Sequence, residues 1–134
     1  MRVALTLYGR DLGSIVGAMG NFTYWVIVDV EDSKYRVVDV IENKGLNVQV
    51  RRGLEAALQI INKGVDAVIT AHLGYHPFEV FKSRGIKIYV TENCSGEKAI
   101  KKLINGELTE VTEVPEHRGE HGHGRGRWYH YWGT

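Results

Sequence analysis

The stretch VDAVIT, residues 65–70, decides how this chain can fold. It is a short and almost continuous apolar run, which is typical of a strand buried on both faces of a sheet. A helix is predicted just before it, because apolar residues recur there at three- and four-residue spacing and Gly64 follows as a terminator. The predicted buried face of that helix is Leu54, Ala57, Leu58 and Ile61. A helix that leads into such a strand favours parallel strands joined by right-handed crossovers.

The same alternation continues toward the C-terminus. We expect a second helix over residues 77–84, ended by Gly85, and a further strand over residues 86–91. Ser95 is predicted to cap a third helix, which Gly106 ends. The residues that this helix is expected to bury are Ala99, Ile100, Leu103 and Ile104. Residues 108–114 alternate between apolar and polar types and could form an edge strand.

Toward the N-terminus the pattern is that of strands. Residues 2–8, 22–30 and 35–41 are β-prone, and the last two are predicted to form a hairpin. The chain is therefore predicted to be an α/β protein, with a mixed five-stranded sheet and helices packed on it. After residue 114 the composition shifts to glycine, histidine and arginine, so we expect a domain over residues 1–114 and a tail over residues 115–134.

Composition excludes several classes of protein. With 134 residues, 43% hydrophobic residues and a net charge of +1, the chain is expected to be one domain without the basic face of a nucleic-acid-binding protein. No apolar run approaches the roughly 18 residues that span a membrane, and no signal peptide is evident, which favours the cytoplasm. The single cysteine, Cys94, excludes an internal disulfide framework and a four-cysteine metal site.

The tail HRGEHGHGRGRWYHYWGT, residues 117–134, is the first candidate site. It carries four of the six histidines, and imidazole binds divalent transition metals. The candidate ligands are His117, His121, His123 and His130. The alternative is a solvated tail that binds metal only through its composition. The tail also holds four large aromatic residues, which favour docking onto the body or onto a second copy. The second of these alternatives would make a homo-oligomer.

A second candidate site follows residues 65–70, where the carboxyl ends of parallel strands place ligands. His72 and His76 flank Gly74 there, and Cys94 follows the next strand, so the three donors could converge on a soft metal. The alternative is an ordinary polar loop and an unremarkable thiol. The glycine-rich loop of residues 9–20 is expected at the same end of the sheet. The glycines whose backbone amides could approach an anionic cluster are Gly13, Gly17 and Gly20.

Three stretches carry a family resemblance. The first is residues 19–30 (MGNFTYWVIVDV). The second is Gly53 followed by residues 64–69 (GVDAVI), and the third is Leu73-Gly74 followed by residues 85–90 (GIKIYV). In order and spacing the chain resembles the dinitrogenase iron–molybdenum cofactor biosynthesis family, small accessory and cofactor-carrier proteins of nitrogenase assembly. The resemblance implies a ribonuclease-H-like three-layer fold, iron–sulfur or molybdenum-containing clusters as ligands, and cofactor-assembly proteins as partners. Ala18 stands where the family has a loop histidine, and residues 47–52 replace a second histidine- and glycine-rich loop.

The favoured function is therefore a non-enzymatic binding or carrier module for a metal or metal–sulfur cluster. One alternative is a protein-interaction module that uses its aromatic tail and holds no cluster. A minor alternative is a hydrolase of the ribonuclease-H-like fold, which needs several carboxylates around two divalent ions. The first predicted strand has no acidic residue, and Asp66 opens its strand at the end away from the expected site, so the hydrolase is disfavoured.

Overall fold

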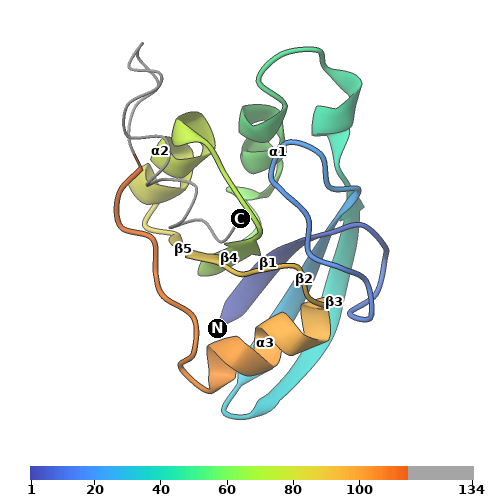
Figure 1. The fold of residues 1–134 in the computed structure, drawn as a ribbon, viewed down its shortest axis with the longest axis vertical. Helices are drawn as coiled ribbons and strands as arrows, with labels where there is room; N and C mark the ends of the chain where they lie inside the picture. The colour runs from blue at the N-terminus through green and yellow to red at the C-terminus, as the bar shows by residue number, and fades with distance from the viewer. Residues whose placement is uncertain (115–134) are drawn as a thin grey trace.

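The central strand of the sheet is β1 (Arg2–Leu7) in a computed structural model, which describes residues 1–114. β1 pairs antiparallel with β2 (Tyr24–Glu31) and parallel with β4 (Ala67–Thr70). β3 (Lys34–Glu42) forms one edge beyond β2, and β5 (Lys87–Val90) lies parallel to β4 near the other (Figure 1). The strand order is β3-β2-β1-β4-β5. The predicted mixed five-stranded sheet and its N-terminal hairpin are confirmed.

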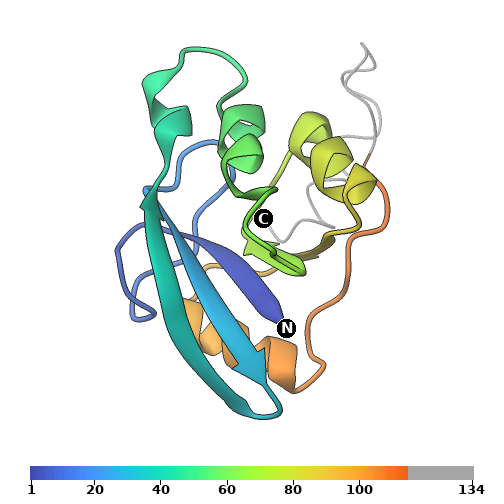
Figure 2. The same ribbon diagram turned by 180° about the vertical axis from the view of Figure 1, so that it is seen from behind.

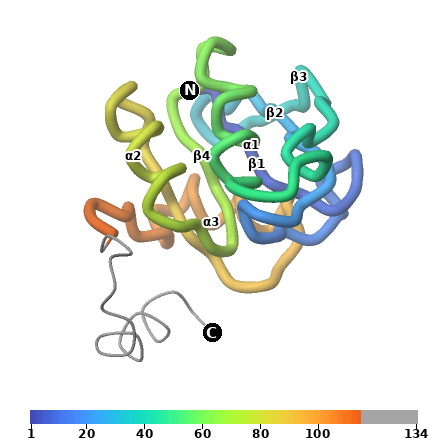
Figure 3. Tube along the Cα trace, turned by 90° about the horizontal axis from the view of Figure 1, so that it is seen from above, coloured from blue at the N-terminus to red at the C-terminus, as the bar shows by residue number. Residues whose placement is uncertain are grey.

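Helices cover both faces of this sheet. α1 (Arg52–Ile60) and α2 (Tyr75–Ser83) pack on one face and lie side by side there (Figure 3). α3 (Gly96–Ile104) packs on the opposite face, as the view from behind in Figure 2 also shows. The result is three layers with two apolar cores, one on each side of the sheet. The assignment to a ribonuclease-H-like fold stays a prediction from the resemblance.

Two of the three predicted helix endings are confirmed, because Gly85 and Gly106 directly follow the C-cap residues of α2 and α3. α1 ends earlier than predicted, at Ile60, and a turn over residues 61–64 separates its end from Gly64. Gly64, Gly85 and Gly106 have φ values of 70°, 71° and 72°, the left-handed region that only glycine enters without strain. At the start of α3 the Ser95 side chain accepts a hydrogen bond from the Lys98 backbone N–H at 3.1 Å, so the predicted cap is also confirmed. These features depend on a few consecutive residues, which is why the sequence revealed them.

The buried face of α1 differs from the prediction. Leu58 is 44% exposed, whereas Ala56, Ala57 and Ile60 are buried. The reason lies in β2, where the indole N–H of Trp25 donates to the Ala56 carbonyl oxygen at 2.9 Å. Only small side chains let the helix approach the buried ring closely enough for this bond. The alanines therefore face the sheet, and Leu58 is turned toward solvent.

Two other elements also differ from the sequence expectation. α2 begins at Tyr75 rather than Pro77, with Gly74 as its N-cap residue. Residues 108–114 do not form a strand. They make an isolated bridge between Tyr89 and Glu110, and the N–H of Val111 donates to the Ile88 carbonyl at 2.8 Å. This segment thus runs along the outer side of β5. No helix within residues 1–114 has the length and apolar character needed to cross a membrane.

Candidate functional site

The glycine-rich loop between β1 and β2 connects the ends of the parallel strands. On one side the N–H of Ala71 donates to the Gly17 carbonyl at 3.1 Å, and the N–H of Met19 donates to the His72 carbonyl at 2.8 Å. On the other side the N–H of Val16 donates to the Cys94 carbonyl at 2.9 Å. The prediction that the loops after β1 and β4 lie at the same end of the sheet is confirmed. Residues 16–19 thus run between the loop that carries His72 and the loop that carries Cys94.

Two buried hydroxyl groups fasten this loop to the sheet. The Oγ1 of Thr6 lies 2.7 Å from the Gly17 carbonyl oxygen, and the Oγ1 of Thr70 lies 3.1 Å from the same oxygen. The two hydroxyl oxygens are 2.9 Å apart, and both side chains are fully buried. Sequence reasoning missed this pair. The available signal was a threonine at or near the carboxyl end of two otherwise apolar strands.

His72 lies on the exposed side of this scaffold. Its backbone carbonyl is used by Met19, while its side chain is exposed and partial desolvation lowers its pKa below the usual 6.5. His76 lies one turn on, within α2, where its exposed ring meets the Tyr75 ring edge-on with centroids 5.7 Å apart. A Cβ on Gly74 between them would meet nothing within 4 Å. An imidazole with a lowered pKa is neutral at pH 7, the form that binds metals.

Cys94 follows β5 and is partly buried. Its Sγ lies 3.6 Å from the Oγ1 of Thr91, beside the start of α3. Within residues 1–114, no group of three or more His, Cys, Asp or Glu side chains is placed to hold a metal ion. His72, His76 and Cys94 are therefore not gathered into a three-ligand centre in this structure. Their role as individual ligands stays a prediction.

The loop glycines serve different local purposes. The N–H of Gly13 donates to the Asp11 carboxylate at 3.0 Å, and the N–H of Gly17 donates to the Thr6 carbonyl at 2.8 Å, so both amides have partners within the protein. A Cβ on Gly17 would lie 2.6 Å from the Tyr8 ring, whereas one on Gly20 would meet nothing within 4 Å. Glycine at position 17 thus lets a 46%-exposed tyrosine ring lie over the loop, a contact that sequence reasoning missed.

The hydroxyl of Tyr8 reaches the far side of the same loop. It donates to the Asn21 Oδ1 at 3.3 Å. The carboxyl end of the parallel strands, here called the open end of the sheet, therefore presents an exposed aromatic ring and an exposed imidazole. It also presents two glycines, Gly20 and Gly74, at which an added Cβ would meet no atom of residues 1–114 within 4 Å. The four tail histidines, His117, His121, His123 and His130, lie outside the described residues.

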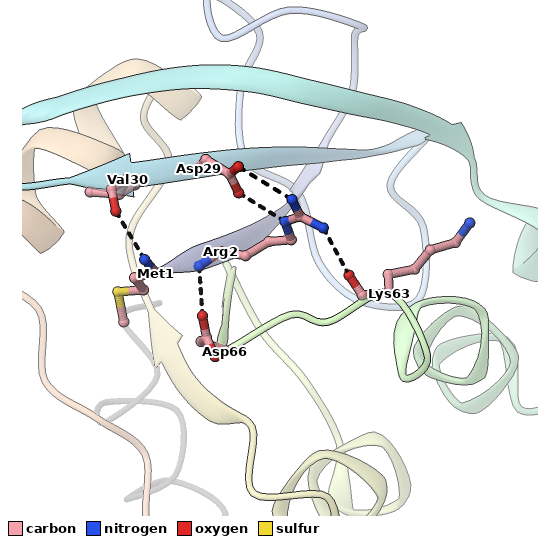
Figure 4. Close-up of polar contacts among 6 residues, drawn as sticks. All are labelled: Met1, Arg2, Asp29, Val30, Lys63 and Asp66. Atoms are coloured by element: carbon pink, nitrogen blue, oxygen red, sulfur yellow. Dashed lines mark hydrogen bonds and ion pairs between the residues drawn. The ribbon is translucent and has the colours of Figure 1, made fainter.

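The opposite end of the sheet is a cluster of charges (Figure 4). The Nε and Nη2 of Arg2 donate to the two carboxylate oxygens of Asp29 at 2.8 and 3.2 Å, and the backbone N–H of Arg2 donates to Asp66 at 2.7 Å. The hydrogen bond from Arg2 lowers the pKa of Asp29. A shallow hollow of about 330 Å³ lies here. It is lined by Met1, Arg2, Asp29, Val30, Glu31 and Asp66.

Comparisons with known proteins agree with this architecture. A protein-family model described as "Dinitrogenase iron-molybdenum cofactor" matches residues 1–106. The uncharacterised protein MJ0580 of Methanocaldococcus jannaschii is 31% identical over 108 residues, which are 81% of this chain and 89% of that protein. A second protein of that organism, MJ0327, is 25% identical over 112 residues, or 84% of this chain and 95% of its own length.

Solved structures show the same fold. The crystal structure of MJ0327 matches with a TM-score of 0.65 and covers 84% of this chain and 96% of that one. The apo form of the orange protein from Desulfovibrio gigas matches with a TM-score of 0.75 and covers 86% of this chain and 96% of that one. At 19% identity the latter likeness concerns the fold alone.

Proposed function

This chain belongs to the dinitrogenase iron-molybdenum cofactor family, and we propose that it is a non-enzymatic module that binds or carries a metal or metal–sulfur cluster. The family match over residues 1–106 carries this proposal. It covers the whole open end of the sheet, including the loop of residues 9–20 and the segment from Ala71 to Gly74. The cluster is cargo in this proposal, handed on to a cofactor-assembly protein.

The donor chemistry of the open end supports cargo of this kind. The exposed His72 has a lowered pKa, so it offers a neutral imidazole at pH 7, and Cys94 offers a thiol. Both residues border the segment of residues 16–19 through backbone hydrogen bonds, so the scaffold fixes where their main chains lie. Among residues 1–114, nothing lies within 4 Å of a Cβ placed on Gly20 or Gly74, so a ligand could approach the backbone at both positions. We expect His72 to be the principal protein ligand, with Cys94 and His76 as further donors.

The test is anaerobic reconstitution of the full-length protein with ferrous iron and sulfide, with and without molybdate. Bound iron, molybdenum and sulfide are measured after desalting. We expect stoichiometric loading of the wild type and binding weaker on the order of tenfold in His72→Ala, since outer-shell partners alone cost 10–100-fold. Asn105→Ala, an exposed change beyond α3, is the matched control and should load normally. A wild type that retains no metal or sulfide, or a His72→Ala protein that loads fully, would contradict the proposal.

The four tail histidines are a separate proposed site for a divalent transition metal. Glycine loses more conformational freedom on ordering than other residues, so we expect histidines spaced among glycines to bind an ion weakly, on the order of micromolar. Zinc or nickel is titrated into the full chain and into a variant in which all four are alanine. We expect most of the affinity to be lost in the variant. Equal affinity in both proteins would place the divalent site on residues 1–114 instead.

The pH dependence separates the two sites. Unperturbed histidines lose metal affinity as pH falls through about 6.5, because the protonated ring cannot coordinate. Since the pKa of His72 is lowered, its ring stays neutral to a lower pH. Binding at His72 should therefore persist below the pH at which tail binding fails. Coincident pH midpoints in the wild type and in the variant without tail histidines would rule out this distinction.

A further inference from the structure

The two edge strands of the sheet, β5 and β3, differ in whether another segment pairs with their outer side. The outer side of β5 is partly occupied by residues 110–111, through the bridge of Glu110 to Tyr89 and the Val111 hydrogen bond. On the other edge, within the described residues, β3 pairs only with β2 (Figures 1 and 2). β3 is nine residues long, and its Val37 and Val38 are 41% and 36% exposed. A long edge strand with exposed β-branched side chains is a template for another strand. The Val40 N–H of β3 donates to the Asp39 Oδ1 at 2.9 Å, so the strand partly satisfies its own backbone.

Charge is divided between the two halves of β3. Lys34 and Arg36 lie in its first half, and Asp39 and Glu42 lie in its second half. All four side chains are exposed, and none has an ion-pair partner within 4.0 Å among residues 1–114. A second copy of the strand placed antiparallel brings unlike charges together. A parallel copy brings like charges together, which is destabilising.

The register of β3 puts the central pair of charges on one face. Arg36 lies opposite Asp29 and Asp39 lies opposite Ile27. Asp29 and Ile27 are two residues apart in β2, so their side chains share a face, and residues opposite them share it too. Arg36 and Asp39 are three apart, which in a regular strand would place them on opposite faces. The irregularity between Ile27 and Val28 supplies the extra residue that restores a common face.

We propose that β3 is a self-association edge, where two copies of this chain pair antiparallel about a two-fold axis between Val37 and Val38. In this register Arg36 lies opposite Asp39 of the partner subunit, and the symmetry repeats the pair. Tyr35 then lies opposite Val40 of the partner subunit, and both side chains pack with the α3 face of the sheet in their own subunit. The pairing is isologous, so it closes at a dimer rather than propagating as a filament.

The irregularity in β3 also limits the strength of this contact. A bulge twists an edge strand and shortens the stretch that can pair flatly, so the dimer should be weak, with a Kd on the order of 100 µM. Sedimentation equilibrium of the full-length protein from about 10 µM to 1 mM, at low salt, measures it. In ¹⁵N spectra over the same range, amide shifts should concentrate in residues 34–42.

Charge reversal provides the decisive test. Arg36→Asp and Asp39→Arg should each weaken dimerisation about tenfold, which is 1.4 kcal/mol across two symmetric pairs. The double variant Arg36→Asp/Asp39→Arg should restore it. Lys87→Asp on β5 gives the same net charge as Arg36→Asp and should leave dimerisation unchanged. Thermal unfolding is measured for each protein, because Arg36 faces Asp29 across the hairpin and its reversal could loosen β3.

Three results would overturn the proposal. The first is a wild type that stays monomeric up to 1 mM. The second is a dimer that both single reversals leave intact, which would place the interface elsewhere, for example on the tail. The third is a double variant that folds as stably as the wild type but fails to recover association. Restoration by the double variant cannot arise from loss of fold, so it separates pairing from a merely structural role.

Discussion

The two ends of the central strand β1 are built in different ways. At its amino end, the Arg2 side chain pairs with the Asp29 carboxylate, and the Asp66 carboxylate accepts the Arg2 backbone N–H. At its carboxyl end, backbone bonds and two buried threonines hold the loops, and the side chains of Tyr8 and His72 are left exposed. Because the charged groups at the amino end pair with groups of the same protein, they contribute to stability. An end whose loops are held through the main chain and two buried hydroxyl groups leaves the Tyr8 and His72 side chains exposed at the surface.

The largest expected effect comes from breaking the scaffold at the carboxyl end. Thr70→Val replaces a buried hydroxyl beside the Gly17 carbonyl with a methyl group, so the free energy of unfolding should fall by about 1–2 kcal/mol. Urea denaturation measures the loss. The Ala71 amide, which donates to the same carbonyl, should also exchange faster with solvent.

Thr109→Val is the matched control for this change, because Thr109 is exposed. Its effect should stay within about 0.5 kcal/mol, as for most surface substitutions. If Thr70→Val is as stable as Thr109→Val and Ala71 exchange is unaltered, the hydroxyl pair does not fasten the loop.

A smaller effect is expected where the loop supports the exposed tyrosine. In Gly17→Ala the new Cβ would lie 2.6 Å from the Tyr8 ring, and the ring, being half exposed, can swing into solvent. The cost should be below about 1 kcal/mol, under the usual range for overpacking a rigid core. The Tyr8 ring resonances should move toward random-coil values. Gly20→Ala, with open space around its Cβ, should leave them in place, and equal shifts in both proteins would contradict the contact.

The smallest effect concerns the charged end and appears only in acid. The pKa of Asp29 in the folded protein lies below its usual 3.8, chiefly because Arg2 hydrogen-bonds the ionised form. Such a group adds stability above pH 3.8, and this stability is lost as pH falls through the lower, folded pKa. Wild type should therefore exceed Arg2→Met in stability at pH 6 and lose that advantage near pH 2.

Arg84→Met, at the end of α2, is the control for removing one surface cation. Its difference from the wild type should not change with pH over the same interval. A constant gap between wild type and Arg2→Met down to pH 2 would mean that Arg2 stabilises the end of the sheet by packing alone.

Much of the fold followed from short stretches of sequence. The apolar run of residues 65–70 predicted the parallel part of the sheet, and Gly85 and Gly106 marked the ends of α2 and α3. The loops after β1 and β4 were placed at one end by the crossover rule alone. These features depend on local backbone preferences or on the right-handedness of crossover connections, so they can be predicted from a single sequence.

The tertiary structure decided the rest, because it depends on partners distant in sequence. Thr6 and Thr70 are 64 residues apart, and only their meeting at Gly17 makes them the fastening of the candidate site. The Trp25 indole, 31 residues from Ala56, set which face of α1 is buried. The periodicity of a sequence predicts that a helix has an apolar side. Which residues of that side become buried depends on the shape of the sheet surface against which the helix packs.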